Sequence, residues 1–266
     1  MARVLSGRRE RILLNYGHRL VEFPLGIFGA ALSVAALPVL SSHATQRDLK
    51  ALTQSVAFAI RLLLFLTLPA TCALIVLRVP IVTILFERGE FTRQATEGTA
   101  VALLYYGMGL CAYAGLKVVV TAFYALQDTR SPVRIGLHTI LLNLLLSLAL
   151  MGPLAHGGLA LATSLAAFVN LGLLGLGLRR HLGQIQGRAM LRSAAKMGLA
   201  SLATAALTGW LAELMLLPTV SGKAQAALLG GIVLTGIVCY SGLTLLLRSE
   251  EAVFLLKLAQ RRAVGD

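Results

Sequence analysis

Long apolar stretches alternate with short polar segments along the whole chain. The first stretch, residues 20–40, is apolar except for Glu22 and Ser33. About 20 apolar residues are needed to cross the hydrocarbon core of a bilayer, so this stretch predicts a transmembrane helix. Six further stretches of this kind follow, at about residues 55–77, 96–124, 132–150, 159–178, 191–217 and 224–247. The pattern predicts an all-α polytopic membrane protein with about seven transmembrane helices.

Two other segments have helical patterns that do not fit a membrane span. Pro80 and Gly89 bracket a short amphipathic piece within residues 78–94. It is too short to cross, and it predicts a helix in the membrane interface followed by a turn. Residues 249–266 carry apolar and basic positions at helical spacing. This second pattern predicts a cytoplasmic amphipathic tail that lies on the membrane surface.

The composition supports the membrane assignment and excludes other classes of protein. Hydrophobic residues make up 57% of the 266 positions, charged residues only 13%, and a soluble domain has about 25% charged residues. The net charge of +13 does not indicate nucleic-acid binding, because the basic residues lie between apolar stretches without interleaved aromatics. Cys72, Cys111 and Cys239 lie in three separate apolar stretches without metal-ligand spacing. We therefore expect no cofactor and no metal site.

The basic residues between the apolar stretches predict the orientation in the membrane. Loops on one side carry thirteen lysines and arginines, namely Arg47, Lys50, Arg130, Arg134, Arg179, Arg180, Arg188, Arg192, Lys196, Arg248, Lys257, Arg261 and Arg262. The other side, leaving out the N-terminal segment, carries four: Arg78, Arg88, Arg93 and Lys223. Because cytoplasmic loops carry the excess of basic residues, the first set and the C-terminus are predicted to be cytoplasmic.

The N-terminal segment conflicts with this orientation. Seven spans with a cytoplasmic C-terminus place residue 1 outside, yet the segment before the first span is basic, with Arg3, Arg8, Arg9, Arg11 and Arg19. Basic segments favour the cytoplasmic side. The conflict is resolved if this sequence corresponds to the back part of a longer protein, and we state that as an expectation.

The first span carries the first candidate binding residues. An α-helix rotates by about 100° per residue. If the helix of the first span continues unbroken past Pro24, one stripe of its surface contains Arg19, Glu22, Gly26, Ala30 and Ser33. Charge followed by small residues is typical of a face turned to a cavity or to another helix rather than to lipid. The alternative is that Arg19 does not face a cavity and that its side chain snorkels to the membrane interface. We expect the same snorkelling of Arg61 in the second span.

The third span is the most polar of the seven. Helical periodicity predicts that several polar residues lie on one side of this helix, namely Tyr106, Tyr113, Lys117, Thr121 and Tyr124. A lysine inside a span costs about 2.5–3.5 kcal/mol on insertion scales, so Lys117 is expected to face water or a partner. Both a structural hydrogen-bonding role and a binding role remain open for it.

The acidic residues argue against an enzyme. A membrane enzyme would need paired carboxylates, histidine clusters or a metal site. The acids are scattered, and none forms a metal-binding pair within a span: Glu22, Asp48, Glu87, Glu90, Glu97, Asp128 and Glu213.

Four ordered sequence motifs carry a family resemblance. They are YGHRLVEFPLGIFGAALSVAALPVLS, LFERGEFT, KVVVTAFYALQDTRSPVRI and GPLAHGGLALATSLAAFVNLGLL. In order and spacing they resemble the second half of the MurJ (MviN) lipid II flippase family, over about residues 14–247. The resemblance implies helices eight to fourteen of a fourteen-helix fold of the multidrug/oligosaccharidyl-lipid/polysaccharide exporter superfamily.

The resemblance also implies a division of the chain. Residues 14–182 would form the second-lobe bundle of five transmembrane helices, and residues 183–248 the two additional C-terminal helices. Residues 249–266 would form the tail. Residues 1–13 do not resemble the family's seventh helix and are expected to be a truncated or frameshifted start, or one side of a split gene.

The function implied is movement of lipid II, the undecaprenyl-diphosphate-linked peptidoglycan precursor, across the bacterial inner membrane during cell wall biosynthesis. Arg19 aligns with a family arginine of the central cavity and would contact phosphate, with Glu22 orienting it or pairing with an arginine of the first lobe. Lys117 aligns with a family lysine. His18 departs from the family, which usually has an acid there, and a histidine cannot supply a permanent negative charge.

The partners implied are lipid II, membrane lipids, and a missing N-terminal lobe or partner chain. Two alternatives remain. The chain could belong to an exporter of another lipid-linked oligosaccharide, or it could be a non-transporting half that acts as a scaffold.

Overall fold

A computed structural model describes residues 2–183, 187–215 and 222–264, with side chains from Ile12 onward except at 188, 222, 257–259 and 261–264. The described residues are helical throughout, apart from short turns, which confirms the all-α prediction. The helices are α1 (Ala2–Pro24), the π-helix η1 (Leu25–Ala30), α2 (Ala31–Thr45), α3 (Leu49–Val76), α4 (Arg78–Phe86), α5 (Arg93–Ala125), α6 (Arg130–Leu182), α7 (Gly187–Met215), α8 (Gly222–Leu246) and α9 (Glu250–Val264).

The predicted first span comprises α1, η1 and α2 in direct succession. The π-helical turn begins directly after Pro24, which has no backbone N–H to donate within the helix. Bonding to the fifth rather than the fourth residue shifts the register by about one residue, roughly 100°. The stripe expected from an unbroken α-helix is therefore displaced only beyond the π-helix. Its members Arg19, Glu22, Gly26 and Ala30 are exposed, whereas Ser33 is half-buried and donates a hydrogen bond to the Gly29 carbonyl (2.8 Å).

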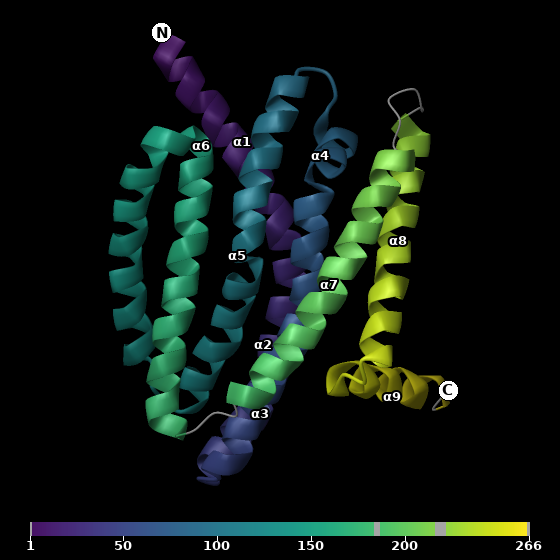
Figure 1. Ribbon diagram of the computed structural model, residues 1–266. Coiled ribbons are helices and arrows are strands. Elements are labelled where there is room, and N and C mark those ends of the chain that lie inside the picture. The colour runs from purple at the N-terminus through teal and green to yellow at the C-terminus, as the bar shows by residue number, and fades with distance from the viewer. Residues whose placement is uncertain (1, 184–186, 216–221, 265–266) are drawn as a thin grey trace.

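The described residues contain six helices long and apolar enough to cross a membrane. One of them, α6, has 53 residues and contains both the fourth and the fifth predicted spans. It folds back on itself at Ala155 (φ 48°, ψ −131°), so Figure 1 shows two antiparallel arms. Gly158 permits the tight reversal, because a methyl group there would overlap the carbonyl oxygen of Leu150. The expected seven crossings are thus present in six helices.

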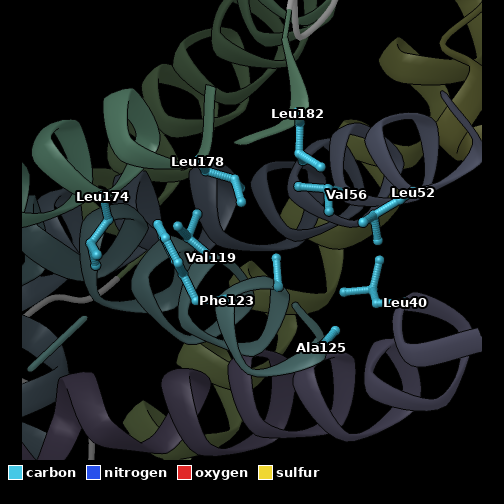
Figure 2. Close-up of a cluster of buried hydrophobic side chains, with 10 residues drawn as sticks. Leu40, Leu52, Val56, Val119, Phe123, Ala125, Leu174, Leu178 and Leu182 are labelled. Atoms are coloured by element: carbon cyan, nitrogen blue, oxygen red, sulfur yellow. The ribbon is translucent and has the colours of Figure 1, made fainter. Parts of the chain in front are cut away.

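The buried helix α5 lies at the centre of the bundle. It packs against α1, α3, α4 and α6. Small residues along α5 allow neighbouring helices to approach closely, as is typical of contacts between transmembrane helices. The buried small residues include Gly107, Gly109, Ala112, Ala114 and Gly115. At one end of the bundle, Phe123 of α5 packs among side chains of α2, α3 and α6 (Figure 2), in the cluster Leu40, Leu52, Val56, Val119, Ala122, Phe123, Ala125, Leu174, Leu178 and Leu182.

The helices α7 and α8 pack on the other side of α3. Their shared core contains Phe65 of α3, Met197 of α7 and Tyr240 of α8. The buried Tyr240 hydroxyl donates a hydrogen bond to the Phe65 carbonyl (2.8 Å). Figure 1 shows that the C-terminal end of α7 and the N-terminal end of α8 diverge from α5. The helix α9 runs across the opposite end of the bundle, where the C-terminus lies.

The two short segments are both helical. The nine-residue helix α4 is followed by a turn at Gly89 (φ 58°), as the sequence pattern predicts. The tail helix α9 is held by Arg61 of α3, whose guanidinium lies 2.9 Å from a Glu250 oxygen and 3.4 Å from a Glu251 oxygen. Their positions in the membrane interface stay predictions.

Candidate functional site

The candidate residues of the first and third spans come from two helices that lie side by side. The ring of His18 on α1 lies 5.1 Å from that of Tyr106 on α5. Further along both helices, a methyl group built at Gly29 would lie 3.2 Å from Cδ of Lys117. Two residues of the polar side of α5 predicted from the sequence, Tyr106 and Lys117, therefore face α1 and η1. The absence of a side chain at Gly29 is what gives the Lys117 stem room to cross the π-helix.

Arg19 is exposed on the outer side of α1. Among the described residues, no hydrogen-bond or ion-pair partner of its guanidinium is found. Arginine stays charged and presents a planar fork of donors, which matches the oxygens of a phosphate. An uncompensated arginine within a membrane-spanning segment is accordingly suited to bind an anion from outside the described bundle.

Glu22 is also exposed, one turn further along α1. Its Oε1 lies 3.3 Å from Nε2 of His18, so the structure pairs it with His18 rather than with Arg19. The contact joins positions i and i+4 of one helix turn. Half of the His18 side chain is exposed (45%), although its Nδ1 is buried without a hydrogen-bond partner. Glu22 thus leaves the Arg19 charge unneutralised.

Lys117 is half-buried against η1. Its ammonium has no hydrogen-bond or ion-pair partner in the part of the chain that the structure describes. Arg19 and Gly29 are ten residues apart on one helix, which corresponds to roughly 15 Å along its axis. The structure therefore places Arg19 and Lys117 along the same pair of helices without bringing them into contact.

A chain of hydrogen bonds that the sequence did not predict fixes α5 against the second arm of α6. The Tyr113 hydroxyl lies 3.0 Å from the Ser164 hydroxyl, which donates to the Tyr105 carbonyl (2.7 Å). The closeness of Ser164 to α5 follows from the reversal at Ala155. No sequence signal links Ser164 to Tyr113, since the two lie 51 positions apart. These contacts hold the helix that carries Lys117.

Arg19 and Glu22 lie on an open face of α1 rather than in an enclosed cavity, with Glu22 beside His18. Lys117 is half-buried between α5 and η1. Within the described ranges, no group of three or more histidine, cysteine or acidic side chains comes together that could hold a metal ion. A cavity around Arg19 would require protein on the exposed side of α1.

Comparisons with known proteins agree with this fold. A family model described as "Lipid II flippase MurJ" matches residues 11–225. A probable lipid II flippase MurJ of Vibrio cholerae is 34% identical over 235 residues, which is 88% of this chain and 45% of that protein. A probable lipid II flippase MurJ of Rickettsia prowazekii is 41% identical over 162 residues, which is 61% of this chain and 32% of that protein.

A solved structure shares the fold. It is described as lipid II flippase MurJ in an inward closed conformation, and it superposes with a TM-score of 0.74 at 24% sequence identity. The match covers 90% of this chain and 47% of that chain. The chain thus spans less than half the length of the relatives that it matches.

Proposed function

Because the chain belongs to the lipid II flippase MurJ family, we propose that it forms one half of a transporter that moves lipid II across the bacterial inner membrane. Lipid II is the undecaprenyl-diphosphate-linked precursor of peptidoglycan, so the role lies in cell wall biosynthesis. The activity proposed is transport rather than catalysis. The family match over residues 11–225 and the predicted crossings within six apolar helices support it.

The observation that carries the proposal is the uncompensated Arg19 on the exposed face of α1. A diphosphate can cross hydrocarbon only if protein groups replace its water shell. The Arg19 guanidinium offers bidentate hydrogen bonds to phosphate oxygens. In this proposal Arg19 contacts the diphosphate, and Glu22 either adjusts the position of Arg19 or pairs with a cation of the opposing lobe. Lys117 adds a second positive charge on the same pair of helices.

The division of the chain follows from the same proposal. Residues 14–182 correspond to the second-lobe bundle and residues 183–248 to the two additional helices, with residues 249–266 as the tail. The C-terminus lies in the cytoplasm, because the loops at the α9 end of the bundle carry the excess of basic residues. The other wall of the cavity comes from protein outside this sequence. Transport then proceeds by rocking of the two lobes about a midplane site.

Growth of a flippase-depleted strain tests the proposal. The chain is co-expressed with the first half of the Vibrio cholerae relative, as wild type or as Arg19→Ala. We expect the wild type to restore growth and Arg19→Ala to abolish it, with Arg19→Lys intermediate because lysine lacks the planar fork. The matched control is Arg134→Ala, an exposed arginine near the opposite end of the bundle. Full growth of Arg19→Ala at normal expression would contradict the assignment.

Reconstitution separates transport by this chain alone from transport by the completed protein. We expect the chain alone to give no flipping of labelled lipid II in proteoliposomes, because one wall of the cavity is absent from it. Flipping by the chain alone would contradict the two-lobe cavity. If the completed protein flips another lipid-linked oligosaccharide and not lipid II, the substrate is corrected. If it flips neither, the scaffold alternative stands.

A further inference from the structure

A second candidate binding site lies away from Arg19. A cavity of about 1100 Å³ opens between two groups of elements: the end of α3 with α4 and the start of α5 on one side, α7 and α8 on the other. In Figure 1 these groups diverge toward the end of the bundle opposite α9. Among the α1 residues whose side chains are described, from Ile12 to Pro24, none lines the cavity, so it is separate from the Arg19 face.

Part of the cavity lining is apolar. Gly209 of α7 lies close to Val76 of α3, because a methyl group built at Gly209 would lie 2.8 Å from a methyl carbon of Val76. Val79, Ile84 and Ala212 also line the cavity. Ligand sites commonly measure about 300–1,000 Å³ with mostly apolar linings. The cavity therefore has room for the head and upper chains of one lipid.

The charged lining residues carry both signs. They comprise three cations and three anions, which are Arg88, Arg93, Lys223, Glu87, Glu97 and Glu213. Two of the anions are engaged. Glu97 lies 3.8 Å from Arg93, and Glu87 accepts a hydrogen bond from the buried Thr96 hydroxyl (2.7 Å).

Four charges at the cavity have no ion-pair partner among the described residues. Arg88 donates to the Ile84 carbonyl (3.1 Å), and Glu87 has only the neutral Thr96 hydroxyl as a partner. Lys223 and Glu213 are exposed, and no ion pair forms at either of them. Two cations and two carboxylates complement a ligand that carries a phosphate and an ammonium group together.

We propose that this cavity binds one bilayer phospholipid with a phosphate–ammonium head group, of the phosphatidylethanolamine class. Arg88 and Lys223 hold the phosphate, and Glu213 accepts the ammonium. The upper acyl chains lie along the apolar wall. An anionic lipid without an ammonium group would leave Glu213 facing like charge, and a soluble phosphate compound would leave the apolar lining residues in water. The lipid is a bound component of the bundle, so this inference stands independently of the transport proposal.

Native mass spectrometry of the purified chain tests the inference. The probes are phosphatidylethanolamine and phosphatidylglycerol with identical acyl chains, added separately to the delipidated protein. We expect one phosphatidylethanolamine per chain, retained at least about fivefold better than phosphatidylglycerol, from ionic contacts of up to about 1 kcal/mol each. Combined Arg88→Gln and Lys223→Gln should lower this retention by a similar factor. Glu213→Gln should abolish the preference between the two lipids.

Two further variants keep the test decisive. Ala226→Phe narrows the cavity without changing its charge and should also lower retention, because Ala226 lines it. The control combines Lys50→Gln and Arg134→Gln, two exposed cations near the opposite end of the bundle, and should retain the lipid as the wild type does. Equal binding of both lipids by the wild type would overturn the proposal. So would unchanged binding in the Arg88/Lys223 variant, or equal loss in the control.

Discussion

Removal of Arg61 should destabilise the chain more than any single exposed charge, because Arg61 neutralises a buried carboxylate. Its side chain is 17% exposed, and that of Glu251 only 1%. Apart from Arg61, the contact made by this carboxylate is the Ser193 hydroxyl, which donates to Oε1 (2.9 Å), and Oε2 has no hydrogen-bond partner. Breaking a buried pair by removing one partner costs about 3–5 kcal/mol.

The neighbouring Glu250 provides the internal comparison. Its oxygen lies closer to the Arg61 guanidinium (2.9 Å) than the Glu251 oxygen does, but its side chain is 74% exposed. Exposed ion pairs contribute about 0–1 kcal/mol. We therefore expect Arg61→Met to cost about 3 kcal/mol and Glu250→Gln less than about 1 kcal/mol. Arg61→Met combined with Glu251→Leu should recover most of the loss, because apolar side chains replace a buried pair at little cost.

A thiol-reactive fluorophore can follow the unfolding, since Cys72, Cys111 and Cys239 are free and half-buried. For 150–250 residues, 1 kcal/mol corresponds to about 2–4 °C in Tm, so Arg61→Met should lower Tm by about 6–12 °C. Two results would refute the reasoning. One is a loss of equal size in Glu250→Gln, and the other is a double variant no more stable than Arg61→Met alone.

Three further predictions concern a turn, a reversal and the candidate site. Asp128 lies between α5 and α6, and hydrogen bonds from Ser131 lower the pKa of its carboxyl group. The ionised carboxylate therefore stabilises the fold at pH values above the ordinary aspartate pKa of 3.8. The wild type should have a higher Tm than Asp128→Asn in that range, and the difference should disappear as the pH falls from 3.8 through the lowered pKa. Gly158→Ala should separate the arms of α6, seen as faster proteinase K cleavage near Ala155 than in Gly152→Ala, where nothing crowds the added methyl. Lys117→Met should leave Tm unchanged, because the ammonium has no partner among the described residues, yet reduce growth of the depleted strain; unchanged growth would make the lysine dispensable.

The spans could be predicted because length and hydropathy are local properties of a sequence. The same holds for the reversal of α6, where the Gly/Pro-rich segment around Ala155 interrupts two apolar stretches. Arg61 shows where local reasoning stops. Its partner Glu250 lies 189 positions away, on a helix whose path across the bundle depends on the packing of α7 and α8.

The candidate site was predictable to a similar degree. Arg19 and Glu22 stand out because charge within a span is costly, and their exposure follows from a stripe that the sequence displays. The π-helical turn after Pro24 could not be predicted, since an added residue per turn depends on how Gly29 packs against α5. The cavity at Arg88 also escaped prediction, because its walls come from separate helices that meet only in the folded chain.

The π-helix also bears on how the gene for this protein can change. A turn of six residues closed by i→i+5 bonding is equivalent to an α-helical turn that has absorbed one inserted codon. Deletion of a single residue between Leu25 and Ala30 would therefore restore α-helical bonding and leave α2 in about the same orientation against the Arg19 end. The same deletion inside the regular helix α3 would instead rotate its two ends by roughly 100° against each other. In the first span, therefore, an alignment gap of one residue can be accommodated without a rotation between its two ends.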